Sequence, residues 1–132
     1  MIIRKKRKRQ IAEGKHKFKA AVFIDAPKDF ATIQKGKGTL VSQGWQISDH
    51  DQAVFKFFLD GNEICGIKRK NRQDVFEAYQ EAYAGDMDPD AIGWQVNLDL
   101  NDLDLGNHKI DIQCSEPDGN ILADKSIQFT LE

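Results

Sequence analysis

Two residues of this sequence could act together as a nucleophile and a base. Cys114 could attack a substrate if a nearby base removed its proton, and His108 is a residue of the kind that does so. Both belong to one expected strand, however, and at about 3.3 Å per residue they lie roughly 20 Å apart. They cannot form a dyad. Cys114 alternates into the core, and His108 is better interpreted as a structural residue that bonds to a turn, so no catalytic residue is predicted.

Acidic residues in two short segments could bind a metal ion. Asp86, Asp88 and Asp90 have the spacing with which a calcium loop begins, but the glycine and the glutamate that such a loop needs further on are missing. Residues 49–51, Asp-His-Asp, could also ligate a metal, but a polar turn between two strands is the better interpretation. The sequence therefore predicts solvated loops, with no metal and no cofactor.

Arg72 and Asp74 form a charged pair just before a segment with helical spacing. A helix start can bind an anion, and the fork of an arginine can clasp a carboxylate. The preferred interpretation is architectural: Asp74 caps the helix, and Arg72 pins the preceding loop to the rest of the domain. Trp45 and Trp94 could stack on sugar rings, but both fall on the inward phase of their strands, which favours core packing.

The charges divide the chain into a basic tail and an acidic body. Residues 1–19 carry nine Lys or Arg against one Glu, and residues 20–132 carry ten against twenty acids, so the net charges are near +8 and −10. We expect residues 1–17 to form a flexible tail and residues 18–132 to form one domain. The tail contains a run of six consecutive cations: Arg4, Lys5, Lys6, Arg7, Lys8 and Arg9. Such a run could contact phosphates, anionic lipids or a polyanionic glycan, or it could be a linker; no aromatic residue interrupts it, so sequence-specific reading of nucleic acid is not expected.

The composition fits one globular domain. A chain of 132 residues can bury a core without staples, and its hydrophobic content of 40% is ordinary. Cys65 and Cys114 come without a CxxC motif or a Cys/His cluster, so two free thiols in a reducing compartment are expected, although a single bridge stays open. No apolar stretch approaches the length of a signal peptide or a membrane span. We expect a cytoplasmic location, with the membrane surface as an alternative.

Alternation of apolar and polar residues predicts strands from Phe18 onward. About seven can be placed, at residues 20–25, 41–48, 53–59, 62–68, 93–99, 108–115 and 126–131. Two tight turns join neighbouring strands, Asp60-Gly61 and Asp118-Gly119. Many short strands with regular turns indicate an all-β fold, an antiparallel β-sandwich.

One segment has helical rather than alternating spacing. Apolar residues recur along residues 72–83 on one face, and Asp74 followed by Glu77 has the form of a capping box. We expect one short amphipathic helix near residues 72–84. Its apolar stripe could cover the outward face of the strand at residues 53–59, because Phe58 on that face is not polar.

Five segments, taken in order, resemble a known family. GTLVSQGW, VFKFFLDGNEICG, NRQDVFEAY, GWQVNLDL and LGNHKIDIQCSEPDGN are similar to the immunoglobulin-like, or fibronectin-III-like, accessory domain of bacterial glycosyltransferases, methyltransferases and surface proteins. The resemblance covers about residues 20–132 and implies an immunoglobulin-like sandwich with an accessory role. Gln43 departs from the small residue usual before Gly44-Trp45, and the family's proline near Gln80 is absent. The positions marked by the motifs look architectural: Trp45, Asp60, Gly61, Arg72, Asp74, Trp94, Gly106, His108, Asp118 and Gly119.

These observations favour a non-catalytic accessory or interaction domain associated with bacterial glycan or cell-envelope polysaccharide metabolism. Its partner would be an adjoining domain or another protein. One alternative is a carbohydrate-binding module that grips its ligand with Tyr79, Tyr83 and Phe30. A second is a tether in which the basic tail holds a polyanion or a membrane surface.

Overall fold

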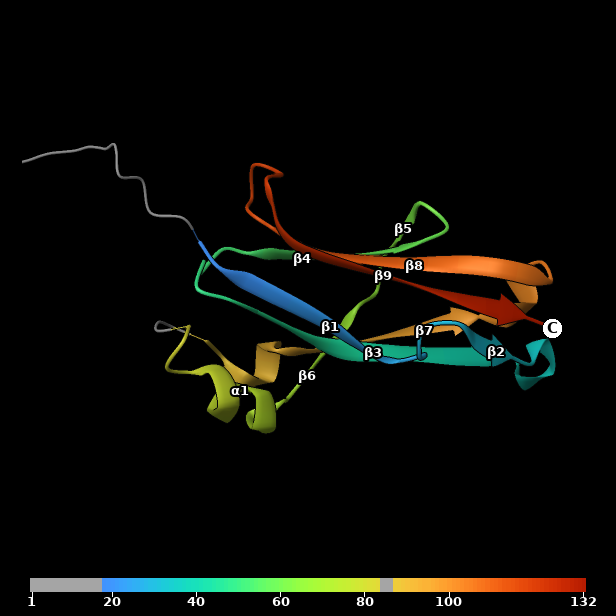
Figure 1. The fold of residues 1–132 in the computed structure, drawn as a ribbon, viewed down its shortest axis with the longest axis horizontal. Helices are drawn as coiled ribbons and strands as arrows, with labels where there is room; N and C mark the ends of the chain where they lie inside the picture. The colour runs from blue at the N-terminus through green and yellow to red at the C-terminus, as the bar shows by residue number, and fades with distance from the viewer. Residues whose placement is uncertain (1–17, 84–86) are drawn as a thin grey trace, which may run out of the picture.

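The computed structural model describes residues 18–83 and 87–132, and within them two β-sheets face each other as a sandwich (Figure 1). Sheet A holds, in spatial order, β1 (Ala20–Ala26), β3 (Thr39–Ser48), β7 (Gly93–Asp99) and β6 (Lys68–Lys70). Sheet B holds β2 (Ala31–Ile33), β9 (Ile121–Leu131), β8 (Gly106–Ser115), β4 (Val54–Leu59) and β5 (Asn62–Ile64). The prediction of an all-β sandwich with a short helix is confirmed. The basic run and Asp86 lie outside the described residues.

The strands are more numerous than expected, and one pairing is parallel. The described residues contain nine strands instead of about seven, because β2 is too short to show alternation and the strand predicted at residues 62–68 is divided into β5 and β6. All neighbouring strands run antiparallel except β2, which pairs with β9 in parallel. Short helical turns fill three of the connections: η2 (Lys35–Lys37), η3 (Pro89–Ala91) and η4 (Leu100–Asp102).

The main core lies between the sheets and follows the predicted phase of three strands. Alternate residues of β7, β8 and β9 are buried as expected: Trp94, Val96, Leu98, Ile110, Ile112, Cys114, Ile127, Phe129 and Leu131. Trp94 is at the centre, fully buried, with its ring 5.2 Å from that of Phe55 and 5.8 Å from that of Phe57. The inward direction of Phe57 and Leu59 on β4 is likewise confirmed.

Strand β3 has the opposite phase to the predicted one. Its inward residues are Ser42, Gly44 and Gln46, whereas Trp45 and Ile47 face away from sheet B and pack beneath the helix. The prediction was wrong because both faces of this strand are covered, so the apolar residues do not identify the side that faces the other sheet. The small side of β3 leaves room for Trp94, whose ring lies against Gly44.

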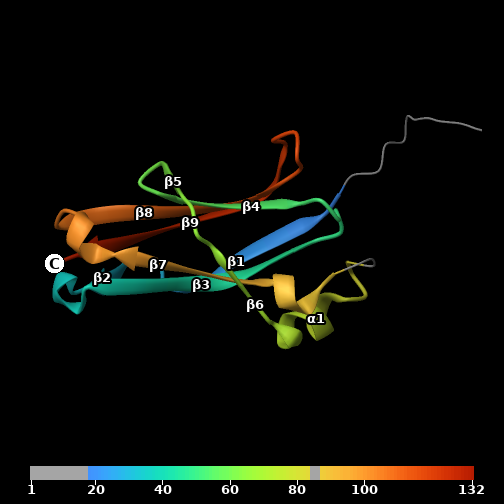
Figure 2. The ribbon, with the colours of Figure 1, turned by 180° about the vertical axis from the view of Figure 1, so that it is seen from behind.

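The helix α1 (Gln73–Tyr79) covers sheet A instead of β4, which lies in sheet B. Figure 2 shows it beyond β3, on the side of sheet A that faces away from sheet B. Val75 is buried there with Ile47 and Ile92, which form a second, smaller core. The predicted cover for Phe58 was therefore wrong; the helix seals the apolar outer face of β3.

The start of α1 also differs from the predicted capping box. The N-cap residue is Arg72, which makes no side-chain cap bond, and Asp74 lies inside the helix. Its carboxylate accepts hydrogen bonds from Arg72, and Glu77 accepts one from Gln73 Nε2 at 3.1 Å instead of reaching back to the N-cap. The arginine competes successfully for the carboxylate because a charge-assisted fork is stronger than a single backbone bond.

The strand predicted at residues 62–68 is two strands in different sheets. β5 returns from the Asp60-Gly61 turn beside β4, the chain then bends at Gly66 with φ +79°, and β6 crosses to pair with β7. Asp60 and Gly61 both have positive φ, 51° and 85°, as a tight hairpin turn of the primed type requires. The Asp118-Gly119 turn joins β8 to β9 as predicted.

Candidate functional site

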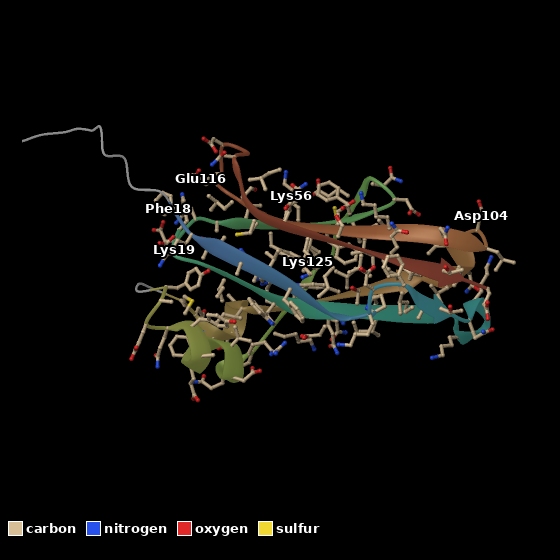
Figure 3. The ribbon with its side chains drawn as sticks, viewed as in Figure 1. Phe18, Lys19, Lys56, Asp104, Glu116 and Lys125 are labelled. Atoms are coloured by element: carbon tan, nitrogen blue, oxygen red, sulfur yellow. The ribbon has the colours of Figure 1, made fainter. Side chains whose placement is uncertain are left out.

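A cleft of about 320 Å³ opens at one end of the sandwich. It is the end at which the β3–β4 connection, residues 49–53, and the labelled residues Phe18 and Glu116 lie (Figure 3). The lining comes from β3, β4, β6 and the segment before β7: Gln46, Ile47, Ser48, Asp49, His50, Asp51, Ala53, Phe55, Arg69, Met87, Asp88, Ala91 and Ile92. We call it the end cleft.

The end cleft exists because β3 is longer than its neighbour β7. The last pair of their ladder joins Trp45 to Gly93, so the end of β3 continues past the start of β7. Gln46 N instead donates to the carbonyl of Ile92 at 2.8 Å. Before Ile92 the chain makes the turn η3, where the Oδ1 atom of Asp88 accepts from the backbone N–H of Asp90 at 3.0 Å. An irregular segment thus replaces a strand and leaves a hollow beside β3.

A chain of polar contacts forms the floor of the end cleft. Arg69 Nη2 donates to Gln46 Oε1 at 3.0 Å and to the carbonyl of Ala91, and Gln46 Nε2 donates to Cys114 Sγ at 3.0 Å. The guanidinium of Arg69 also lies 5.5 Å from the ring centre of Phe55. Burial raises the pKa of Cys114 and lowers that of Arg69. A buried thiol with a raised pKa stays protonated, so Cys114 is a structural residue of the core and not a nucleophile.

The rim of the end cleft is acidic. Asp49 Oδ1 accepts from the backbone N–H of Lys19 at 2.7 Å, and Asp51 is largely exposed. His50 is held by both ends of its ring: Nδ1 accepts from Gln52 N at 3.0 Å, and Nε2 lies 3.8 Å from Glu116. The carboxylates are therefore spread around the mouth, where Asp49 accepts a backbone hydrogen bond and Asp51 reaches solvent.

The structure gathers no metal centre among residues 18–83 and 87–132, where no three His, Cys, Asp or Glu side chains are grouped to hold an ion. Asp88 caps η3, and Asp90 accepts from Asn71 Nδ2 at 2.8 Å. These two acids and residues 49–51 lie in the connections between strands.

His108 lies far from the end cleft, at the end of the sandwich where Figure 3 labels Asp104. Its Nδ1 is 2.6 Å from Asp60 Oδ2, and its Nε2 is 2.6 Å from the backbone oxygen of Asp104. Both partners are acceptors, so both ring nitrogens donate, which only the protonated imidazolium can do. Burial lowers the pKa of His108, but the bonds to Asp60 and Asp104 outweigh it, and the pKa is raised overall. Asp60 also accepts from Lys109 N at 2.8 Å, so His108 ties β8 to the β4–β5 turn.

Arg72 joins the helix to sheet A. Its Nη1 donates to Asp25 Oδ2 on β1 at 2.7 Å, while Nε and Nη2 donate to the two oxygens of Asp74 at 3.0 and 2.9 Å. The bond from Arg72 lowers the pKa of the exposed Asp74 to about 2, and the same contacts raise the pKa of Arg72. All three nitrogens of the guanidinium donate to the two carboxylates, so it offers little to an anionic ligand.

The two tryptophans have different surroundings. Trp94 is inside the main core, and its Nε1 is the one buried side-chain nitrogen or oxygen of the described residues that has no hydrogen-bond partner. Trp45 is half-buried on the outer face of sheet A in a row of rings: Phe23 at 5.7 Å, Trp45, Tyr79 at 5.6 Å and then Tyr83 at 6.2 Å from Tyr79. Burial raises the pKa of Tyr83. Only Phe23 and Tyr79 of this row are exposed, by 36% and 38% of their surface.

The other residues marked in the sequence shape turns. Gly106 and Gly119 have φ of +115° and +98°, which side-chain-bearing residues rarely adopt. Asp118 Oδ1 accepts from Asn120 N at 3.0 Å. Phe30, proposed as a ring for gripping a glycan, is 73% exposed beside β2 and makes none of the ring contacts found among the described residues.

Sequence reasoning did not find the end cleft. Gln46 lies in a strand whose inward face was predicted wrongly, and Arg69 lies just beyond the strand predicted at residues 62–68. One signal was present: Gln46 falls between the large apolar residues Trp45 and Ile47 of a strand with two covered faces. A polar residue in such a place needs a buried partner, but the sequence does not identify it.

Comparisons with known proteins show the fold alone. No protein-family model matches the sequence, and neither does any curated protein compared with it. Among solved structures, the chain is similar to part of the endo-β-1,4-mannanase from Thermotoga petrophila, with a TM-score of 0.57 and 11% identity. The similarity covers 91% of this chain and 21% of that one, so the present chain spans about a fifth of the enzyme's length.

Among the described residues, no helix has the length and apolar character needed to cross a membrane.

Proposed function

We propose that this chain is a non-catalytic, immunoglobulin-like accessory domain of a glycan-handling protein, in which it positions an adjoining domain or binds a protein. The observation that carries the proposal is the similarity of its fold to about a fifth of an endo-β-1,4-mannanase. In that chain, most of the length lies outside the sandwich-like part. An accessory domain has the same relation to the enzyme that contains it.

The use of the ionisable side chains supports a non-catalytic role. His108, Arg72 and Cys114 are each engaged by partners that fix a turn, a helix or the core. A catalytic acid, base or nucleophile must instead present its reactive atom to a substrate. The side chains most suited to catalysis are thus engaged in hydrogen bonds that hold the fold together.

Carbohydrate binding is a second function, and the end cleft favours it. The cleft combines apolar walls with hydrogen-bonding side chains, the usual composition of a small-molecule site. Binding would complement the positioning role, because an accessory domain that holds a glycan also locates its neighbour on that glycan.

Incubation of the purified chain with soluble polysaccharides tests the non-catalytic role. Mannan, xylan and β-glucan are incubated separately with increasing protein, and the release of reducing ends is measured against a heat-unfolded sample. We expect no release above that control. Release that rises in proportion to protein concentration overturns the proposal, and the His108→Gln variant then shows whether the buried imidazole of His108 is responsible.

A further inference from the structure

We propose that the end cleft binds a neutral sugar unit of a glycan, with Arg69 and Asp88 as hydrogen-bonding partners and with Met87, backed by the buried Ile47 and Ile92, against the apolar face of the ring. The inference rests on the proposed association with glycans and gives it a site and a ligand class.

The cleft has the dimensions of a ligand site and rigid walls. Its volume of about 320 Å³ falls at the lower end of the range of roughly 300–1,000 Å³ found for small-molecule pockets. Ile47 and Ile92 are 2% and 3% exposed and belong to the small core that α1 seals. Met87 packs against the same core. The helix layer therefore fixes one wall of the cleft in place.

The polar atoms of the cleft are only partly used. Arg69 Nη2 donates to Gln46 and Ala91, whereas Nε and Nη1 of Arg69 have no hydrogen-bond partner among the described residues. Asp88 Oδ1 accepts the hydrogen bond of the turn from Asp90 N, whereas Asp88 Oδ2 has no hydrogen-bond partner among the described residues. The cleft thus offers donors from β6 and an acceptor from the residue that caps η3. A hydroxyl group both donates and accepts, so a ligand rich in hydroxyls can use both kinds of group.

The lining carries three carboxylates and one guanidinium. Asp49, Asp51 and Asp88 oppose an anionic ligand, because like charges at close range are unfavourable. A cation would be attracted by these carboxylates, but at the floor it would meet the guanidinium of Arg69. A neutral ligand with hydroxyl groups and apolar C–H faces satisfies the polar atoms and the apolar wall together. A sugar unit without charge is such a ligand.

Titration of the full chain with trisaccharides tests this site. Mannotriose, cellotriose and xylotriose serve as neutral probes, a galacturonate trimer as the anionic probe and a glucosamine trimer as the cationic probe. Backbone amide shifts are followed by NMR up to about 20 mM ligand, because a one-sugar site is expected to have a millimolar Kd. We expect a neutral probe to shift the amides of residues 49–51 and 91–92, with weaker effects from both charged probes.

Two matched variants locate the binding. Asp88→Asn keeps an oxygen for the η3 turn but changes the second oxygen to an amide, and we expect affinity to fall about tenfold with the loss of a charged hydrogen bond. Asp99→Asn is the control, since Asp99 caps η4 in the same way, accepting from Asn101 N at 3.0 Å. It should leave affinity unchanged. Ala91→Trp, at an exposed position of the lining, should abolish binding by filling the cleft.

The outcomes separate this inference from the proposed function. If a neutral trisaccharide binds but Asp88→Asn and Ala91→Trp leave its affinity unchanged, the glycan association stands and the cleft is refuted as its site. If a charged trimer binds more tightly than the neutral ones, or if no probe shifts the cleft amides, the inference is wrong, whereas the non-catalytic role is decided by the reducing-end assay. Should Ala91→Trp fail to fold, the Asp88→Asn and Asp99→Asn pair still decides.

Discussion

Gly44 lies where β1, β3 and the core tryptophan approach most closely, and its replacement by alanine should be strongly destabilising. An added Cβ atom would lie 1.9 Å from the carbonyl oxygen of Phe23 and 2.7 Å from Cζ2 of Trp94. Non-bonded carbon contacts are normally about 3.5–4.0 Å, so β1 would have to retreat by more than about 1 Å. The first obstacle is backbone, which cannot rotate away as a side chain can.

The expected cost follows from two contributions. Overpacking a close-packed site costs about 1–3 kcal/mol, and each ladder hydrogen bond weakened between β1 and β3 costs about 1 kcal/mol more. We therefore expect the free energy of unfolding of Gly44→Ala to be about 3 kcal/mol or more below that of the wild type. Gly36→Ala is the control, because no atom lies within 4 Å of its added Cβ and its backbone needs no positive φ.

Urea unfolding followed by tryptophan fluorescence measures both variants, since Trp94 is buried in the native core. Gly36→Ala should stay within about 1 kcal/mol of the wild type, with a small gain from the stiffer unfolded chain. If Gly44→Ala also lies within about 1 kcal/mol of the wild type, β1 and β3 separate at little cost, and the close packing of this strand pair is not what holds sheet A together.

Three further results are expected. The pKa of His108 is raised in the fold, so protonated His108 stabilises the folded state fully below the unfolded pKa of 6.5, and this stabilisation is lost as pH rises through the higher folded pKa. The free energy of unfolding should decline over this pH window in the wild type and stay flatter in His108→Gln. Equal slopes would count against the imidazolium bond. Both cysteines are free thiols, so a thiol reagent should react rapidly with the exposed Cys65, and with the buried Cys114 only after unfolding; two fast thiols would contradict the core position of Cys114. If the basic run binds polyanions, the affinity for heparin should fall steeply between about 50 and 200 mM salt and vanish when residues 1–17 are removed. Salt-insensitive binding by the truncated chain would place the site on the sandwich. No binding by the full chain at low salt would favour a linker.

The strands whose inward side the sequence predicts correctly are those with one face buried and the other exposed to solvent. On β7, β8 and β9 the polar residues reach solvent, so alternation gave the correct inward side, Trp94 included. On β3 the helix covers the second face, and the inward residues Ser42, Gly44 and Gln46 are small or polar. Ser42 donates to the carbonyl of Ala26 at 3.0 Å, a partner far along the chain that periodicity cannot reveal.

The end cleft could not be predicted for a related reason. It depends on where β7 begins relative to β3, and on a crossing of β6 between sheets that turns at Gly66. Neither the register between strands nor a sheet change leaves a pattern in one segment alone. Asp88 was recognised as an acid in a loop, but its place beside Arg69 follows only from the assembled sheets.

The placement of the first and last strands determines how the sandwich responds to mechanical tension. The described chain enters at Phe18 at one end of the molecule, in sheet A, and its last strand runs to the opposite end in sheet B (Figures 1 and 3). A pull between these points acts along β1 and β9, so the hydrogen bonds that join them to β3 and β8 are loaded together in shear instead of being opened one after another. The domain would therefore resist extension and keep these two points separated by the length of the sandwich.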